Sequence, residues 1–365
     1  MRLLVRARNR ALAVAGGRIV AAEGPFDVVI DAPGSELLPG LINAHDHLHR
    51  NHYGRLGRPP YPNAYAWAVD IQRRDAAAIA AGRGRPRREA LLDGAWKNLF
   101  AGVTSVVHHD RWEADFERSF PLRVVRIAQA DSLGMGGLPT GFKPAQRFCL
   151  HLAEGMDAAA ADEIRTLDDA GQLSSRLIAV HGVGMDRDAI DRFRASGAAL
   201  VWCPSSNLFL FGRTAPAGLL AEGLDLLLGS DSMLTGDGDL LDELRCAREL
   251  GMVSDARLAG AVGATAARVL GLPEPTLARG ASADLVLMAR PLLGARASDV
   301  QMVMAGGRLR VLHPELVAAF APKLPLGAMR AMGGVTRWTS DHTEPDDVHL
   351  APRSECIAPI RQETF

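Results

Sequence analysis

Histidine or aspartate ends almost every short apolar run in the central part of this sequence. The residues that do so are His45, His47, His108, His151, His181 and Asp231. Between the runs lie stretches with helical periodicity, and this alternation indicates parallel strands joined by crossover helices. Because the carboxyl ends of parallel strands meet at one edge, these polar side chains are expected to converge on one site.

The alternating region covers residues 39–275, which is the length of a (β/α)8 barrel. Its strand candidates are the runs ELLPGLINAH, GVTSVVHH, LRVVRIAQA, RFCLH, RLIAVH, AALVWCP and LDLLLGSD. Its helix candidates include residues 87–102, 158–171, 187–197, 239–251 and 257–271. An open doubly wound sheet is the competing architecture, but the polar strand ends favour the barrel. The predicted fold class is therefore α/β, with a TIM-like barrel as the main domain.

Both ends of the chain have a different texture. Residues 1–38 and 276–313 contain short β-like runs separated by glycine-containing breaks. Each flank is too small to bury a face alone, so we expect the two to pair into one small β-sandwich domain. Residues 314–365 lose this pattern, are broken repeatedly by proline, and are predicted to be a C-terminal extension.

The composition restricts the partners and the location. The 41 basic and 42 acidic residues leave a net charge of −1. Nucleic acid and membrane surfaces are therefore poor partners, and a small-molecule substrate is expected. The longest apolar stretches fall short of the roughly 18 residues of a spanning helix. Arg6, Arg8 and Arg10 stand where a signal peptide needs its apolar region, so a cytoplasmic location is expected.

The first candidate motif is His45-Asp46-His47, which ends the run LLPGLIN. Side chains two apart in a strand point to the same face, so both imidazoles can reach one point while Asp46 turns away. This arrangement suits a metal ion. An HxH motif alone is a weak signal, and an exposed or core position is the alternative.

The second motif places His151 and Glu154 after the run RFCL, directly before Gly155. Residues three apart in a regular strand face opposite sides, so both enter one site only if the chain turns back, which Gly155 allows. A neutral imidazole binds a divalent ion, and a nearby carboxylate can transfer protons. Glu154 is therefore the candidate general acid and base, with an exposed glutamate at a helix start as the alternative.

Two further strand ends carry candidates. His181 ends RLIAV and could bind a metal or hydrogen-bond to a reacting atom, with a buried structural histidine as the alternative. Asp231 ends LDLLLGS, where an unpaired carboxylate would be costly to bury and a cation is the commonest remedy. We therefore expect Asp231 to be a metal ligand.

In their order along the chain, the motifs PGLINAHDHLH, GVTSVV, HLAEG, HGVGM, CPSSN and GSDS resemble the amidohydrolase superfamily. The likeness is to its branch of cytosine, guanine and S-adenosylhomocysteine deaminases and triazine hydrolases, and it spans residues 1–313. This resemblance implies a metal-bearing barrel with a small β-sandwich made from both chain ends.

The resemblance also implies the roles of the site residues. It implies one divalent metal ion, zinc or else iron, held by His45, His47, His151 and Asp231. It further implies that Glu154 is the proton shuttle and that His181 orients or polarises the substrate, with Asp231 also acting on the attacking water. A binuclear site bridged by a carbamylated lysine is not expected, because none of the three lysines ends a strand.

One departure from the family pattern concerns the fourth strand. Between GVTSVVHH and HLAE these enzymes have two further β/α units, whereas this chain offers LRVVRIAQA and then a glycine- and proline-rich stretch. We therefore expect the fourth strand to be missing or vestigial while the metal site survives. His108 and His109 are expected to fill some of that space. Because the missing strand would alter the wall of the pocket, the sequence does not determine the size of the substrate or the contacts of a possible homodimer.

The predicted function is hydrolytic deamination of a nitrogen heterocycle by a metal-bound hydroxide. Hydrolysis of another C–N or C–Cl bond, such as opening of a cyclic amide, is the first alternative. A non-catalytic metal-binding homologue is the second. Loop residues that could contact the substrate are His49, Asn51, His52, Tyr53, Arg55, Trp202, Ser205, Ser206, Asn207, Met233 and Asp237.

Overall fold

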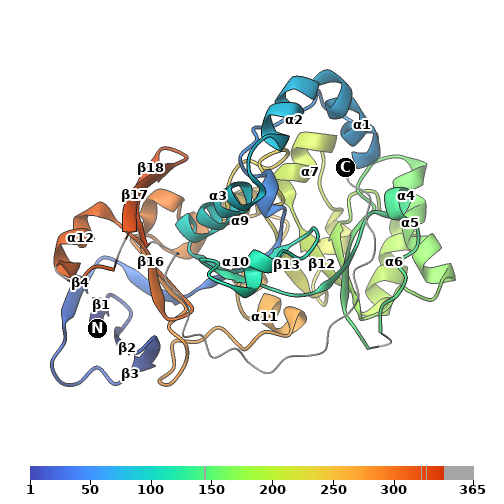
Figure 1. The fold of residues 1–365 in the computed structure, drawn as a ribbon. Helices are drawn as coiled ribbons and strands as arrows, with labels where there is room; N and C mark the ends of the chain where they lie inside the picture. The colour runs from blue at the N-terminus through green and yellow to red at the C-terminus, as the bar shows by residue number, and fades with distance from the viewer. Residues whose placement is uncertain (144, 322, 326, 341–365) are drawn as a thin grey trace.

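The structure, a computed structural model, describes residues 1–143, 145–321, 323–325 and 327–340. Figure 1 shows the strands from both ends of the described chain, in blue and in orange to red, gathered on one side of the molecule. The helix-rich middle of the chain lies on the other side. None of the described helices is long and apolar enough to cross a membrane.

Eight parallel strands in two sheets form the centre of the helix-rich part. The first sheet has the order β6-β7-β8, with bounds Leu41–Asp46, Val103–His108 and Arg123–Val124. The second has the order β13-β12-β11-β10-β9, with bounds Leu226–Leu228, Ala199–Trp202, Leu177–His181, Phe148–Leu152 and Ala128–Ala130. A parallel bridge between Asp46 and Asp231 links β6 to the residues after β13. The described strands thus follow the order of a barrel without forming one closed sheet.

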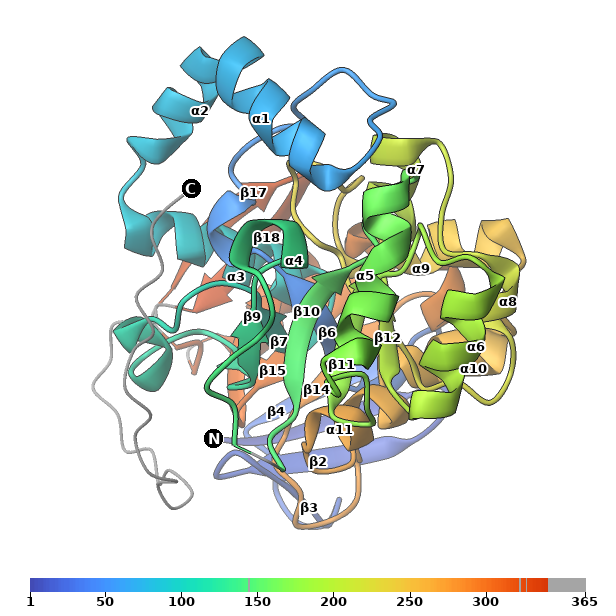
Figure 2. The same ribbon diagram turned by 90° about the vertical axis from the view of Figure 1, so that its right-hand side faces the viewer.

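Helices flank these strands, as Figure 2 shows for α5 and α6 beside β10 and β11. The early helices are α1 (Ala64–Arg74), α2 (Ala76–Arg83), α3 (Arg87–Phe100) and α4 (Leu133–Gly136). The next are α5 (Ala158–Asp169), α6 (Arg187–Ser196), α7 (Pro204–Phe211) and α8 (Ala217–Leu220). The last of this part are α9 (Leu240–Leu250), α10 (Asp255–Ala261) and α11 (Ala264–Leu270). Aspartates cap α5, α6 and α9, which explains where these helices begin.

Burial of both faces explains the composition of the strands. Every residue of β6, β7, β11 and β12 is buried. A parallel strand covered by helices on one side and by other strands on the other has no face for polar residues. A polar side chain inside such a strand needs hydrogen-bond partners, as Asn43 has in Asn98 and Ser230, whereas the histidines stand at the strand ends.

The predicted strand LRVVRIAQA is broken in two. Its first part, β8, pairs with β7, whereas its second part, β9, pairs with β10. Among the described residues between Ala130 and Phe148 there is one short helix, α4, and no strand. The third strand position therefore adjoins β10 directly, because no described fourth strand separates them.

The strand-rich part contains two sheets that share one apolar cluster. The smaller has the order β3-β2-β1-β4, with bounds Arg18–Val20, Ala11–Ala15, Arg2–Ala7 and Val28–Ala32. The larger has the order β17-β18-β16-β15-β14-β5, with bounds Gly327–Met332, Val335–Ser340, Arg308–Leu312, Val300–Ala305, Leu285–Met288 and Glu36–Pro39. Side chains such as Val5, Ile30, Leu285 and Met302 lie in the same buried cluster. The two flanks of the sequence thus meet in space.

The run ELLPGLINAH also divides, at Gly40. Its first half, β5, pairs with β14 in the larger sheet, and its second half is β6 of the parallel sheet. A Cβ atom at Gly40 would lie 2.2 Å from Oγ1 of Thr104. Only glycine fits this close approach, which ties the two parts of the molecule together.

The beginning of the predicted C-terminal extension is part of the larger sheet. After α12 (Pro314–Phe320), strand β18 pairs with β16 and buries Trp338 in the shared cluster. The sequence gives little sign of this pairing, since β17 is largely exposed and carries no alternating pattern. Residues 341–365 of the predicted extension lie outside the described residues.

Candidate metal centre

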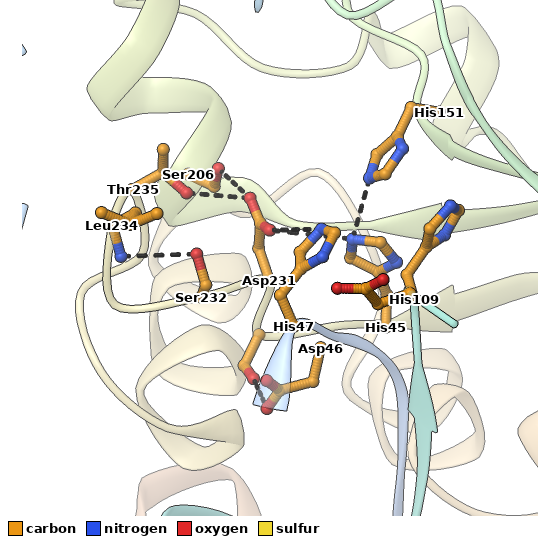
Figure 3. Close-up of polar contacts among 12 residues, drawn as sticks. His45, Asp46, His47, His109, His151, Ser206, Asp231, Ser232, Leu234 and Thr235 are labelled. Carbon is orange, nitrogen blue, oxygen red and sulfur yellow. Dashed lines mark hydrogen bonds and ion pairs between the residues drawn. The ribbon is translucent and has the colours of Figure 1, made fainter. Parts of the chain in front are cut away.

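Four strand-end side chains from three parts of the chain converge. His45 Nε2 lies 3.3 Å from His151 Nε2 and 3.7 Å from Asp231 Oδ1. His47 Nε2 lies 3.6 Å from the same Asp231 oxygen. Figure 3 shows these side chains pointing toward one another, with His45 and His47 coming from the same strand end. The structure therefore brings together all four residues that were predicted as metal ligands.

Main-chain contacts hold Asp231 in this position. Its amide donates to the carbonyl of His45 at 3.1 Å, and its carbonyl accepts from the amide of His47 at 3.0 Å. Its φ of 53° is in the left-handed region, which a non-glycine residue adopts only where its surroundings hold it. Ser206 and Thr235 donate to Oδ2 at 2.6 and 2.9 Å. Oδ1 is thereby left facing the imidazoles.

The protonation of this group suits a divalent cation. Burial lowers the pKa of His45, His47 and His151, which keeps the three imidazoles neutral with a lone pair each. Burial acts to raise the pKa of Asp231, but hydrogen bonds such as the one from Ser206 hold it below its usual range. Three neutral nitrogens and one carboxylate form a typical donor set for zinc or iron.

Glu154 and His181 lie beside the cluster. Glu154 Oε1 is 3.4 Å from His181 Nε2, and burial raises the pKa of Glu154 to about 7. His181 Nδ1 donates to Asn207 Oδ1 at 2.8 Å, and the Asn207 amide nitrogen donates to Thr214 Oγ1 at 3.3 Å, which fixes the orientation of the amide. In a neutral ring the lone pair of His181 is therefore on Nε2, facing Glu154.

Comparison with known proteins decides the family. The 5-methylthioadenosine/S-adenosylhomocysteine deaminase of Haloquadratum walsbyi is 32% identical over 362 residues, which cover 79% of this chain and 82% of that protein. Residues 148–310 match the amidohydrolase family. The chain belongs to the amidohydrolase family. Its predicted enzyme class, a hydrolase acting on C–N bonds other than peptide bonds, is confirmed with it.

Other members and solved structures agree with the family. A relative from Syntrophus aciditrophicus with the same enzyme name is 30% identical, over 78% of this chain and 80% of its own. The zinc-bound adenosine deaminase of Xanthomonas campestris has a TM-score of 0.65 at 20% identity, over 86% of this chain and 94% of its own. A triazine hydrolase from Arthrobacter aurescens has a TM-score of 0.64 at 19% identity, over 85% and 95%. These likenesses show a TIM-barrel-like α/β fold for this amidohydrolase.

The turn that carries Glu154 differs from the prediction. Ala153, with a φ of 51°, takes the left-handed conformation, whereas Gly155 does not. Gly155 is required for another reason, because a Cβ there would lie 2.6 Å from Cβ of Asn63 and 2.8 Å from the carbonyl of Pro62. The glycine thus permits close packing of the segment before α1 against the loop that carries Glu154.

Asp46 points away from the cluster, as the spacing predicts, and enters a buried polar network. Its carboxylate lies 3.0 Å from Lys97 Nζ and accepts from Asn98 Nδ2 at 2.8 Å and from Ser230 Oγ at 3.1 Å. Lys97 also donates to Ser230 at 3.0 Å. The network anchors the strand end between the two histidines, and the sequence gives no sign of it because its members are far apart along the chain.

Several residues predicted to contact substrate instead support the site. Ser206 donates to Asp231, and Asn207 accepts from His181. Ser205 bonds to the buried carboxyl of Glu243. Trp202 is fully buried in the core between strands and helices, so the alternative of a core position is the one observed. The sequence thus indicates correctly that the segment after β12 lies at the site, but it does not indicate what the side chains of that segment do there.

The loop after β6 also differs from the prediction. His52 and Tyr53 bond to carbonyls of the segment around α2 rather than facing the histidines. His49 pairs with Asp110 at 3.1 Å. The other residues predicted to contact substrate in this loop and in the loop after β13 bond to protein groups instead. Asn51 donates to Asp46 and accepts from the amide of Met233, and Arg55 forms an ion pair with Asp237.

The sequence prediction assigned His109 no role beyond filling space. Its ring centroid lies 4.1 Å from that of His151 and 5.2 Å from that of His45. Figure 3 shows His109 beside the cluster, on the side away from Asp231. The adjacent His108 faces away from the cluster and accepts from the amide of Leu48 at 3.1 Å. The sequence indicates this position of His109 only by the pair His108-His109 at the end of a buried strand. Because side chains alternate along a strand, one of the two histidines is expected to enter the site.

Proposed function

We propose that this amidohydrolase is a metal-dependent hydrolytic deaminase of a nitrogen heterocycle. The observation that supports it most is the position of Glu154, a largely buried carboxyl with a pKa of about 7, 3.4 Å from His181 and beside four potential ligands. A general acid and base needs a pKa near the working pH, and burial supplies it here.

We propose that one zinc ion is held by His45, His47, His151 and Asp231. A zinc ion bound there would lower the pKa of water to about 7 and would so supply hydroxide as a nucleophile at neutral pH. The Asp231 carboxylate, fixed by Ser206 and Thr235, is placed to accept the proton that the attacking water loses. Zinc is preferred over iron because the similar Xanthomonas adenosine deaminase carries it.

Glu154 and His181 divide the remaining chemistry. Glu154 donates a proton to a ring nitrogen as the hydroxyl adds to the neighbouring carbon, and then delivers the proton from water to the leaving amine. His181, held by Asn207 through Nδ1, stabilises negative charge on the tetrahedral centre in its protonated form, with hydrogen on Nε2 as well. The products are the ring carbonyl compound and ammonia.

The substrate class follows from the relatives' names. These include deaminases of 5-methylthioadenosine, S-adenosylhomocysteine and 5'-deoxyadenosine. We therefore propose an aminopurine nucleoside as the first substrate to test. Ammonia release separates this reaction from hydrolysis of another C–N or C–Cl bond, which uses the same residues. A non-catalytic homologue would release nothing from any compound.

The central test is the variant Glu154→Gln in protein of known zinc content. Turnover is expected to fall about 10²- to 10⁴-fold, the usual contribution of a general acid and base, while zinc content stays at one ion per chain. Ammonia release is measured with purines, pyrimidines, pterins and triazines. Glu274→Gln, the same change in an exposed loop, is the control. A Glu154→Gln enzyme with near wild-type turnover would show that Glu154 is not the proton shuttle.

The domain organisation is part of the proposal. Residues 1–38 and 276–313 would form a β-sandwich, and residues 39–275 the barrel domain that carries the reaction. The cluster shared by the two sheets of the strand-rich part supports this division.

A further inference from the structure

His109 lies in a barrel-like fold in which β9 pairs directly with β10, with no described fourth strand between them. It follows β7, its amide bonds to the carbonyl of Asp46 at 2.9 Å, and its side chain is buried at 4% exposure. Its ring lies against those of His151 and His45. A buried imidazole beside a proposed metal centre needs partners for both of its nitrogens.

The hydrogen bonding of His109 fixes where its proton lies. Nε2 is 3.2 Å from the carbonyl oxygen of Ala130, and a carbonyl can only accept, so Nε2 carries hydrogen. A second proton would make a buried cation next to a proposed cation site, which is costly. Nδ1 therefore carries a lone pair, and this buried atom has no hydrogen-bond partner among the described residues.

His45 has the complementary need. Its Nε2 faces Asp231 and His151, so under the proposed function the lone pair that binds zinc is on Nε2. Nδ1 of His45 must then carry hydrogen, and it too is buried without a partner in the described part of the chain. One nitrogen of His45, one nitrogen of His109 and the sulfur of Cys149 lie within 4.8 Å of one another.

We propose that His109 is a positioning residue of the metal centre, whose Nδ1 accepts a hydrogen bond from Nδ1 of His45 once the metal ion is bound. The chain of contacts then runs from His45 through His109 to the carbonyl of Ala130 at the end of β9. Such an outer partner fixes the tautomer and the ring orientation of a ligand histidine and makes it a better donor. The inference rests on the proposed function, because it requires a metal at Nε2 of His45.

A second metal ion among His45, His109 and Cys149 fits less well. A neutral imidazole has one lone pair, so His45 cannot bind one cation through Nε2 and another through Nδ1 without losing its last proton. The nearby group of His49, His108 and Asp110 is excluded by similar reasoning. The amide of Leu48 occupies the lone pair of His108, and the Arg87 guanidinium lies 3.3 Å from Asp110.

The test compares zinc affinity in His109→Phe and His109→Asn, measured by competition with a chelator. Phenylalanine keeps an aromatic ring but offers no acceptor, so zinc is expected to bind 10- to 100-fold more weakly. Asparagine can place its amide oxygen where Nδ1 lies, so its affinity is expected to stay within about threefold of wild type. His313→Phe, the same change in the strand-rich part, should leave zinc affinity unchanged.

Two zinc-affinity results would overturn the proposal while leaving the metal site intact. One is zinc affinity in His109→Phe equal to wild type, and the other is equal loss in His109→Asn and His109→Phe. Nitrogen-15 NMR of labelled histidines gives a direct readout, since zinc-loaded wild type should show a hydrogen-bonded Nδ1–H of His45 that His109→Phe loses. Its absence from the wild type would also overturn the proposal. Wild-type protein that binds no zinc would overturn the proposed function as well.

Discussion

At the scale of single residues, backbone strain marks the site. Ala153, His181 and Asp231 are the non-glycine residues with positive φ in the described chain, and all three lie at the ends of parallel strands. Such conformations are costly and persist only where the surroundings impose them. Hydrogen bonds do so here, since Asp231 is tied to His45 and His47, and Ala153 donates to the carboxyl of Glu163 at 2.7 Å. Strain is thus concentrated where side chains must be aimed at one point.

Buried carboxyls behind the site make stability depend on pH. Glu243 is fully buried, and burial raises its pKa to about 8 from an ordinary 4.5. Between these values the folded chain holds a proton that the unfolded chain has lost, so stability falls as pH rises. In Glu243→Gln the amide replaces the protonated carboxyl against Ser205 and does not titrate. We expect the variant to match wild type at pH 5 and to exceed its free energy of unfolding by roughly 3 kcal/mol at pH 8.

Urea denaturation at the two pH values measures this difference, with Glu274→Gln as the exposed control. A difference that does not change between pH 5 and pH 8 would show that Glu243 has an ordinary pKa in the folded protein.

At the scale of elements, the alternation of side chains along a strand explains why the sequence predicts the convergence of the ligand residues. His45 and His47 share a face because they are two apart, and the ends of β6, β10 and β13 meet because parallel strands lie side by side. The family resemblance, confirmed by the comparisons, adds the expected role of each. The roles of the individual site residues stay predictions.

What the sequence could not predict depends on contacts between distant elements. The carboxylate of Asp46 meets Lys97, some fifty residues later, only because α3 packs against β7 and against the turn after β6, with Lys97 facing inward. The break of LRVVRIAQA into β8 and β9 likewise reflects two different neighbours rather than any feature of the run itself. Local pattern carries no information about such partners.

The packing of the segment before α1 on the Glu154 loop gives a prediction at this scale. Gly155→Ala would bring a Cβ within 2.6 Å of Asn63 and force the segment away, at an expected cost of about 1 to 3 kcal/mol in the free energy of unfolding. Amide hydrogen exchange over α1 should become faster. Gly218→Ala on α8 is the matched control, since its Cβ would meet Ile190 at an ordinary 3.8 Å. Unchanged exchange in α1 would contradict the close packing.

At the scale of the whole molecule, the strand-rich part is completed by residues beyond the predicted domain boundary. Trp338 of β18 is buried against side chains from the other sheet. Trp338→Ala is expected to cost about 3 to 5 kcal/mol in chemical denaturation, as for a large core side chain. Zinc affinity should be unaffected, because the tryptophan belongs to a cluster separate from the histidines. A cost below about 1 kcal/mol would show that this hairpin does not belong to the core.

The pairing of β5 with β14 joins residues about 250 positions apart, and it has a consequence for biosynthesis. Strands β1 to β4 can pair with one another early, but five of the six strands of the larger sheet that they face are translated about 250 residues later. The apolar face of the smaller sheet therefore stays uncovered until β14 to β18 have emerged, and during that interval the nascent protein is exposed to aggregation and dependent on chaperones.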